Sequence, residues 1–276
     1  MAPTVRVNDE RSPGGRFLRA VRMSAPDVAP VLHRAHVGFR AEDAVSTSWL
    51  MPPMPALTLM FDVSRQGAGE PWVEGMREHP APVMLPRSYG LFDVKLTPPG
   101  AFSILGMPLG ELGDHPLALA DVVGPAAARA LDERVREASD WGRRFDLLEA
   151  FLRRRLAAEF TPSGPVTRAW QRLQETDGAV RVGALAREVG WSRRHLSAEF
   201  GAQIGLPPKR AARLLRFRAL LRDVERVPAG WADAALAHGY YDQPHLDREF
   251  RAFTGVTPSA WMARRVGSME AVPTPP

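Results

Sequence analysis

The chain has 276 residues and a net charge of +5, and it is long enough for two domains of ordinary size. It contains no cysteine, which excludes disulfides, thiolate metal sites and cysteine nucleophiles. No apolar run approaches the roughly 20 residues that a membrane span needs. Residues 1–15 also lack the apolar core of a secretory signal. These features predict a cytoplasmic protein.

The N-terminal part of the chain has the pattern of a β domain. Residues 1–16 are polar and predict a frayed end. Alternation over Leu57–Phe61 predicts a strand that is buried on both faces. Phe92, Val94 and Leu96 alternate with Asp93 and Lys95, which predicts a half-exposed strand. Nine prolines between positions 52 and 99 exclude long helices. We therefore expect a mostly-β barrel or sandwich.

The pattern becomes helical after residue 116. Residues 124–139 and 140–160 have helical spacing and predict a helix pair that trails the β region. The segment 161–165, Thr-Pro-Ser-Gly-Pro, cannot continue a helix and predicts a linker. The pattern of residues 166–265 predicts helices only. Residues 266–276 are predicted to form a disordered tail. The expected fold is α+β, with a β domain and trailing helices at 17–160 and an all-α domain at 166–265.

Positive charge is concentrated in the all-α domain. Between Arg181 and Arg222 there are ten basic and two acidic residues, a local net charge of +8 that exceeds that of the whole chain. Such a patch indicates a polyanionic partner, with nucleic acid first. The alternative is a solvated charged face in an arginine-rich chain, since only Lys95 and Lys209 are lysines.

The same pattern is written twice in this domain, over Leu185–Pro208 and Ala234–Pro258. Five residues of the first copy recur fifty residues later: His195, Leu196, Phe200, Gly205 and Pro208 match His245, Leu246, Phe250, Gly255 and Pro258. Upstream of them, Ala186 and Gly190 recur forty-nine residues later as Ala235 and Gly239. The second copy therefore has one extra residue, in its turn. A repeat with one insertion confined to a turn predicts two copies of one supersecondary unit.

Each copy has the pattern of a helix-turn-helix. A short helix ends at Gly190, where a left-handed residue is easily accommodated, and Ser192 is placed to cap the next helix. In that helix Leu196 and Phe200 form an inner face, which leaves polar donors outside. Asp242 is the corresponding cap of the second copy. Any single helical hairpin could show such spacing, but two copies in register favour a pair of helix-turn-helix units.

The two copies resemble the AraC/XylS family of transcription regulators, in the segments LAREVGWSRRHLSAEF and GYYDQPHLDREFRAFTGVTPSAW. The chain departs from the family pattern at four positions: Ala234, Tyr240, Leu246 and Trp261. The resemblance implies two units joined by a long helix over Pro207–Asp223, with recognition helices in successive major grooves. It also implies an N-terminal domain, often a cupin-like barrel, that senses a small-molecule effector or mediates dimerisation. The implied partners are double-stranded DNA, an effector, RNA polymerase and a second copy of the chain.

The resemblance also suggests which residues contact DNA. The candidate base-contacting residues are Arg193, Arg194, His195 and Ser197 in the first unit, and Gln243, His245 and Arg248 in the second. Arginine pairs well with guanine, and glutamine with adenine. The candidate phosphate-contacting residues are Lys209, Arg210 and Arg213. Because the outer residues of the two units differ, we expect them to read different half-sites.

A cupin-type metal enzyme carrying a DNA-binding appendage is the alternative. Its candidate ligands would be His33, His36, His79 and His115, but no His-x-His occurs. Surface or packed histidines are the favoured interpretation. No nucleophile-elbow, phosphate-loop or dinucleotide-binding motif occurs either. We therefore expect no catalytic site, metal or cofactor, and metal analysis of the purified protein separates the two hypotheses.

Overall fold

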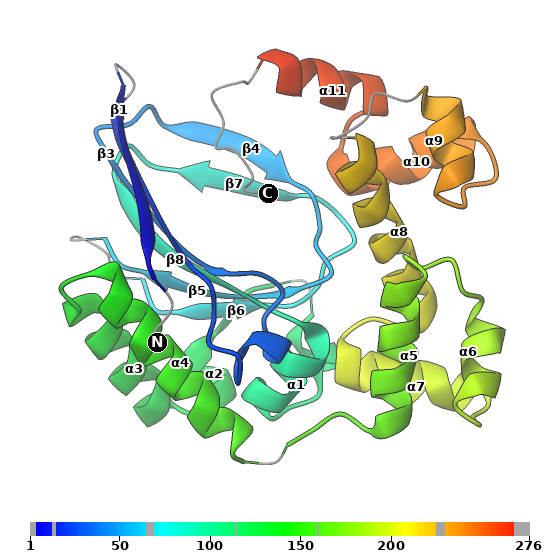
Figure 1. Cartoon of the computed structure of the whole chain (residues 1–276), viewed down its shortest axis with the longest axis horizontal. Coiled ribbons are helices and arrows are strands. Elements are labelled where there is room, and N and C mark those ends of the chain that lie inside the picture. The colour runs from blue at the N-terminus through cyan, green and yellow to red at the C-terminus, as the bar shows by residue number, and fades with distance from the viewer. Residues whose placement is uncertain are drawn as a thin grey trace.

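The computed structural model describes residues 4–12, 15–64, 69–113, 115–158, 160–224 and 230–267. Within them, an N-terminal region built on an antiparallel sheet is followed by a C-terminal region of helices only (Figure 1). The expected α+β class is confirmed. Most of the predicted tail, residues 268–276, lies outside the described residues. No helix among the described residues is long and apolar enough to cross a membrane.

The N-terminal region contains one large antiparallel sheet and a separate two-stranded ribbon. The sheet strands, in spatial order, are β1 (Arg6–Ser12), β2 (Gly15–Arg22), β3 (His36–Glu42), β8 (Tyr89–Leu96), β5 (Leu57–Asp62), β6 (Trp72–Glu74) and β9 (Leu117–Ala118). The ribbon pairs β4 (Thr47–Met51) with β7 (Ala81–Leu85). In Figure 1 the ribbon lies opposite β5, β6 and β8.

The first strand lies where the sequence predicted a frayed end. Residues Arg6–Ser12 pair with Gly15–Val21 in an antiparallel register, so this part of the prediction is wrong. The segment is an edge strand, and its backbone groups bond to β2 while its polar side chains remain in solvent. Arg16 and Asp9 form an ion pair at 2.6 Å on this surface. Hydrophobic periodicity does not mark such a strand.

Helices cover one face of the sheet and form the main core with it. They are α1 (Pro98–Leu105), α2 (Leu119–Val123), α3 (Pro125–Glu137) and α4 (Trp141–Leu156), with single turns η1 (Ala29–Val31) and η2 (Leu109–Leu112). The Phe92 ring on β8 lies 5.4 Å from that of Phe145 and 6.3 Å from that of Trp141, both on α4. The helix pair α3–α4 lies where the spacing of residues 124–160 predicted it.

The second face of β8 is also covered, contrary to the sequence prediction. Asp93 and Lys95 were expected to face solvent, but both are buried. The Lys95 Nζ donates to Thr58 Oγ1 at 2.6 Å and lies 3.1 Å from Asp93 Oδ1. Met51 and Met54, at and after the end of β4, line a small hollow beside Lys95 and Thr58. A chain segment distant in sequence thus covers a strand face that local alternation predicted to be open.

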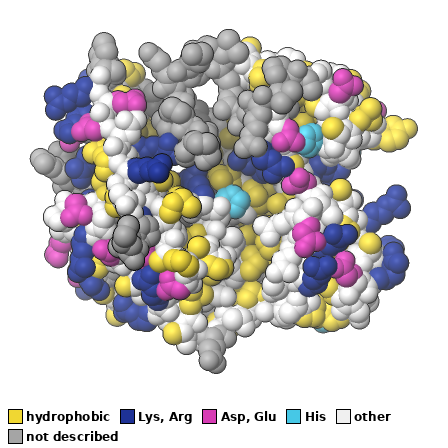
Figure 2. Space-filling view, viewed as in Figure 1, with side chains coloured by type: hydrophobic (Ala, Val, Ile, Leu, Met, Phe, Trp, Pro, Cys, Tyr) yellow, Lys and Arg dark blue, Asp and Glu magenta, His cyan; other side chains and the backbone are white. Residues whose placement is uncertain are grey.

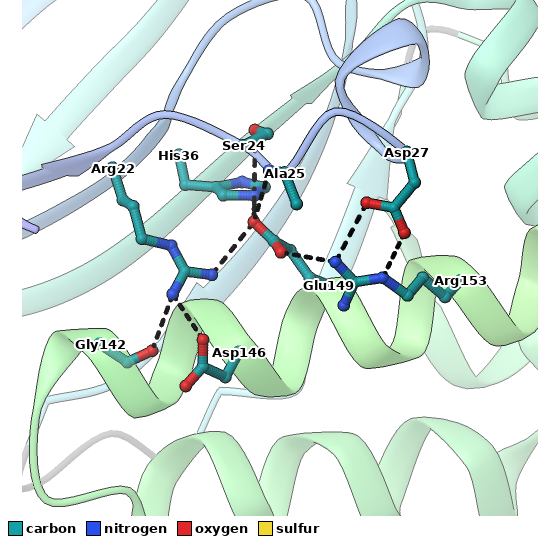
Figure 3. Close-up of polar contacts among 9 residues, drawn as sticks. All are labelled: Arg22, Ser24, Ala25, Asp27, His36, Gly142, Asp146, Glu149 and Arg153. Atoms are coloured by element: carbon teal, nitrogen blue, oxygen red, sulfur yellow. Dashed lines mark hydrogen bonds and ion pairs between the residues drawn. The ribbon is translucent and has the colours of Figure 1, made fainter. Parts of the chain in front are cut away.

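A buried ionic network joins α4 to the sheet (Figure 3). Glu149 of α4 lies 3.1 Å from the Arg22 guanidinium of β2 and 3.3 Å from His36 Nε2 of β3. It also accepts a hydrogen bond of 3.0 Å from Arg153. Burial lowers the pKa of His36 to about 4, an effect that Arg22 reinforces and Glu149 opposes. His36 is therefore neutral at pH 7, and Arg22 and Arg153 balance the charge of Glu149.

The C-terminal helices share two separate cores. They are α5 (Gly164–Glu175), α6 (Val182–Glu188), α7 (Arg193–Ile204), α8 (Pro208–Val224), α9 (Trp231–Ala237), α10 (Gln243–Thr254) and α11 (Pro258–Gly267). Buried residues of α5–α7 and of α8 up to Leu215 are continuous with the core of the N-terminal region. From Phe217 onward, α8 packs with α9 and α10 in a second, smaller core. The long helix α8 therefore spans both cores.

Candidate nucleic-acid interface

The first unit is a helix-turn-helix formed by α6 and α7. Gly190 adopts the left-handed conformation at φ 71°. The next backbone N–H, that of Trp191, donates to the Ala186 carbonyl at 2.9 Å. The Ser192 hydroxyl accepts a hydrogen bond of 3.2 Å from the His195 N–H and caps α7. These contacts satisfy the ends of both helices and fix the angle between them.

The second unit repeats the same contacts in α9 and α10. Gly239 also has φ 71°, and the Tyr240 N–H donates to the Ala235 carbonyl at 2.9 Å. Asp242 caps α10 by accepting from the His245 N–H at 2.7 Å. The repeat predicted from sequence is thus present as two equivalent turns. The extra residue lies between Tyr240, which is buried, and the cap. It is Tyr241, whose surface is 87% exposed.

The inner faces of both second helices are fully buried. Leu196 and Phe200 of α7 join the main core, and Leu246 and Phe250 of α10 form the centre of the smaller one. The Phe250 ring contacts three others, at 5.5 Å for Phe217, 5.9 Å for Trp231 and 6.1 Å for Trp261. This packing leaves the opposite face of each helix to present polar side chains.

The outer face of α7 presents Arg193, Arg194 and His195, all exposed, and Ser197, which is half-buried. They are not equally available to a ligand. The His195 ring stacks edge-on against Trp191 at 4.4 Å, and the Arg193 guanidinium lies over Gly183 of α6. Arg194 forms no hydrogen bond or ion pair with any described residue. It is therefore the most available donor at the N-terminus of this helix.

The outer face of α10 presents Gln243 and Arg248, both exposed, and the half-buried His245. His245 stabilises its own turn, because its Nδ1 accepts from the Tyr241 N–H at 3.3 Å and its ring lies 5.4 Å from that of Tyr240. Gln243 and Arg248 remain as donors. Tyr241 stands beside them and was absent from the sequence prediction, although the extra residue in the second turn marked its position.

The three candidate phosphate contacts at the start of α8 have different surroundings. Lys209 is exposed and has no ion pair within the described part of the chain. Arg210 and Arg213 instead both contact Glu78, which lies between β6 and β7 in the N-terminal region. Arg213 also pairs with Glu249 of α10 at 2.8 Å. The sequence predicted one role for all three cations. In the structure Lys209 is unpaired among the described residues, whereas Arg210 and Arg213 are both in ion pairs.

A second group of cations lies between the sheet and α8. Asp93 is flanked by Arg34 at 2.5 Å and by Lys95 at 3.1 Å. Burial lowers the pKa of His33 to about 4, and the nearby charges of Arg218, Arg34 and Lys95 lower it further. Figure 2 shows basic side chains and a histidine near the centre of this face. Positive charge converges on Asp93 and His33 from β8, from the loop before β3 and from α8.

The four histidines considered as metal ligands do not come together into a recognisable site. His36 is buried against Glu149 and stacks on Phe145 at 5.7 Å. His79 and His33 lie in loops at different parts of the N-terminal region. Among the described residues, no group of three or more His, Asp or Glu side chains could hold a metal ion.

Comparison with known proteins identifies the repeated region. Residues 185–264 match the family model of a helix-turn-helix domain. No curated protein sequence matches the chain. Similar solved structures include an apo variant of ToxT from Vibrio cholerae strain SCE256, with 11% identity over 83% of this chain and 97% of that one at a TM-score of 0.44. The unsaturated-fatty-acid-bound ToxT of the same strain has 10% identity over 79% and 94% of the two chains, at a TM-score of 0.43.

Proposed function

We propose that the chain is a DNA-binding transcription regulator of the AraC type, in which α7 and α10 enter successive major grooves on one face of the duplex. The match of residues 185–264 to the model of a helix-turn-helix domain supports this proposal. The observation that carries this proposal is the pair of equivalent capped turns, which present α7 and α10 with their N-terminal polar residues exposed. Helices of such units read base edges with these residues.

The two helices would read different sequences. We assign base contacts to Arg193, Arg194, His195 and Ser197 of α7 and to Gln243, His245 and Arg248 of α10, with Arg194, Gln243 and Arg248 as the most available donors. Arginine favours guanine and glutamine favours adenine. Lys209, Arg210 and Arg213 are assigned to phosphates, and Tyr241 is added as a neighbour of the second reading helix. Phosphate contacts position the protein without reading sequence.

Arg194→Ala and Lys209→Ala are expected to separate the two kinds of contact. Loss of Arg194 should relax the preference at one base pair by about 1–3 kcal/mol, because a paired guanine edge is lost. Loss of Lys209 should weaken binding to all DNA sequences alike. It should also make the affinity less dependent on salt, by the equivalent of about one phosphate contact. Dissociation constants for a preferred site and its single-base variants, measured at several salt concentrations, test this. Uniform weakening by both variants would show that Arg194 does not read a base.

We further propose that the N-terminal region senses a small molecule with an anionic group. Lys95 and Arg34 both reach the carboxylate of Asp93, and Glu74 lines the hollow beside Lys95. Burial lowers the pKa of Lys95 and that of Arg19, and Arg34 adds to both shifts by charge repulsion. An anion bound beside Lys95 and Arg34 would relieve the repulsion between these cations. It would also lie close to α8, because Arg218 is near His33.

Ligand-induced thermal stabilisation tests the effector proposal. Carboxylates and phosphates are expected to raise the melting temperature more than their uncharged analogues do. A ligand at 100 times its dissociation constant adds about 2.7 kcal/mol. Lys95→Met should remove most of this ligand-induced rise in melting temperature. The matched control Lys209→Met, at the start of α8, should leave the rise unchanged. Equal stabilisation by the uncharged analogues would contradict an anionic effector.

We propose RNA polymerase and a second copy of the chain as partners, a cytoplasmic location in contact with DNA, and no catalytic activity. The exposed apolar side chains of Val45 and Met84, in and beside the β4–β7 ribbon, would be covered in a dimer. Stoichiometric metal in the purified protein, bound by His33, His36, His79 or His115, would instead favour the metal-enzyme alternative.

A further inference from the structure

One carboxylate of the N-terminal region holds two of the cations that we assign to DNA phosphates. Glu78 lies in the loop between β6 and β7. Its carboxylate accepts a hydrogen bond from Arg210 Nε and lies 3.5 Å from Arg213 Nη1. The Glu78 side chain is only 12% exposed, whereas Arg210 is 51% and Arg213 36% exposed. Solvent therefore screens the carboxylate less than it screens the two guanidinium groups.

Arg213 connects Glu78 to the second helix-turn-helix unit. Its Nε donates to Glu249 of α10 at 2.8 Å, and the Glu249 side chain is buried. Its guanidinium also lies 5.4 Å from the centre of the Phe253 ring. Arg213 thus contacts the N-terminal region and the second unit from one position on α8. That position lies immediately before the point where α8 passes from the first core to the second.

These contacts use the donors and the charge that a phosphate would need. A guanidinium binds carboxylate and phosphate through the same N–H groups. In the present arrangement the carboxylates of Glu78 and Glu249 balance the charges of Arg210 and Arg213. Lys209, one residue earlier, remains exposed and without an ion pair to any described residue. The start of α8 therefore presents one available cation and two occupied ones.

We propose that Glu78 is an autoinhibitory carboxylate that competes with DNA phosphates for Arg210. When the Glu78 loop is in place, Lys209 is the one available cation of the three at the helix start. When the loop withdraws, Arg210 also becomes available to the backbone of the duplex, while Arg213 keeps its ion pair with Glu249. The N-terminal region thereby regulates DNA affinity through charge, without contacting the reading helices. This inference rests on the proposed function, namely on the contact of α8 with phosphates.

The test is the affinity of full-length Glu78→Gln for a selected DNA site, as a function of salt. Binding is expected to tighten roughly 5- to 20-fold. The salt dependence of binding should become steeper by the equivalent of about one phosphate contact, because Arg210 is released. Glu175→Gln is the matched control, since it removes the same charge from an ion pair with Arg168 and Arg172 inside the helical domain. It should change affinity less than about twofold. Unchanged or weaker binding by Glu78→Gln, or an equal gain in the control, would overturn the proposal.

Two further variants separate failure of this inference from failure of the DNA-binding assignment. Adding Arg210→Ala to Glu78→Gln should cancel most of the gain. If it does not, while Arg194→Ala still weakens binding, Arg210 does not contact phosphates but α7 still reads DNA.

Discussion

Replacing Phe250 by alanine is expected to unfold the second helix-turn-helix unit while the rest of the protein stays folded. Phe250 is completely buried, and three aromatic rings surround it within 6.1 Å. Truncating such a phenylalanine costs about 3–5 kcal/mol. Among the described residues, the second core has nine buried apolar side chains, so the unit has little stability to lose. It is separate from the main core, and the loss should remain local.

Hydrogen exchange measured by mass spectrometry tests this prediction. Protection should be lost in α9, α10 and α11 and retained in the sheet and in α5–α7. Specific DNA affinity should fall by roughly 100-fold or more, because one of two reading surfaces is lost. The matched control is Phe200→Ala, at the same position of the first unit, whose core is continuous with the sheet. That variant should lower the main unfolding transition. If Phe250→Ala lowers it equally, the two cores are not independent.

Removal of the Glu149 carboxylate is expected to cost about 3–5 kcal/mol of unfolding free energy, as for other broken buried ion pairs. Arg22 and Glu149 are both almost fully buried and lie 3.1 Å apart. Glu149→Leu leaves the guanidinium of Arg22 in the core with Asp146 as its remaining carboxylate partner in the network, and Asp146 is 56% exposed. His36 does not replace the lost charge. Burial lowers its pKa to about 4, and it is neutral at pH 7.

Urea unfolding of single and double variants measures this cost. Arg22→Met with Glu149→Leu should recover much of the loss, because an apolar pair of similar volume needs no charge compensation. The control is Asp27→Asn, which breaks an exposed ion pair with Arg153 on the same helix. It should cost less than about 1 kcal/mol. A double variant as unstable as the sum of both single ones would show that Arg22 and Glu149 are not coupled.

The helix-turn-helix domain could be predicted from sequence because its signals are local. Each unit has a left-handed glycine followed within three residues by a helix cap. These are Gly190 and Ser192 in the first unit and Gly239 and Asp242 in the second, and the structure has both pairs as predicted. The insertion in the second turn also marked the position of Tyr241. The exposure of Tyr241 could not be predicted, because it depends on Tyr240 occupying the buried site.

The N-terminal region was harder to predict because distant segments decide it. Alternation along β8 correctly indicated a strand, but the burial of Asp93 and Lys95 depends on the ribbon and the chain after β4. Glu78 and Arg210 are 132 residues apart, and no local pattern relates them. Spacing can therefore assign cations to a helix, but which of them are occupied depends on the tertiary structure.

Selection of bound sites from a random DNA pool, at stated salt, tests the central claim that one chain reads DNA with two different helices. Arg194 at the start of α7 and Gln243 at the start of α10 differ, so the site should be directional. It should contain two unlike conserved segments about one helical turn, or 10–10.5 base pairs, apart. Alanine variants of Arg194 and Gln243 should each relax the base preference in one of the two segments. A site that is palindromic within the footprint of one chain would contradict the account.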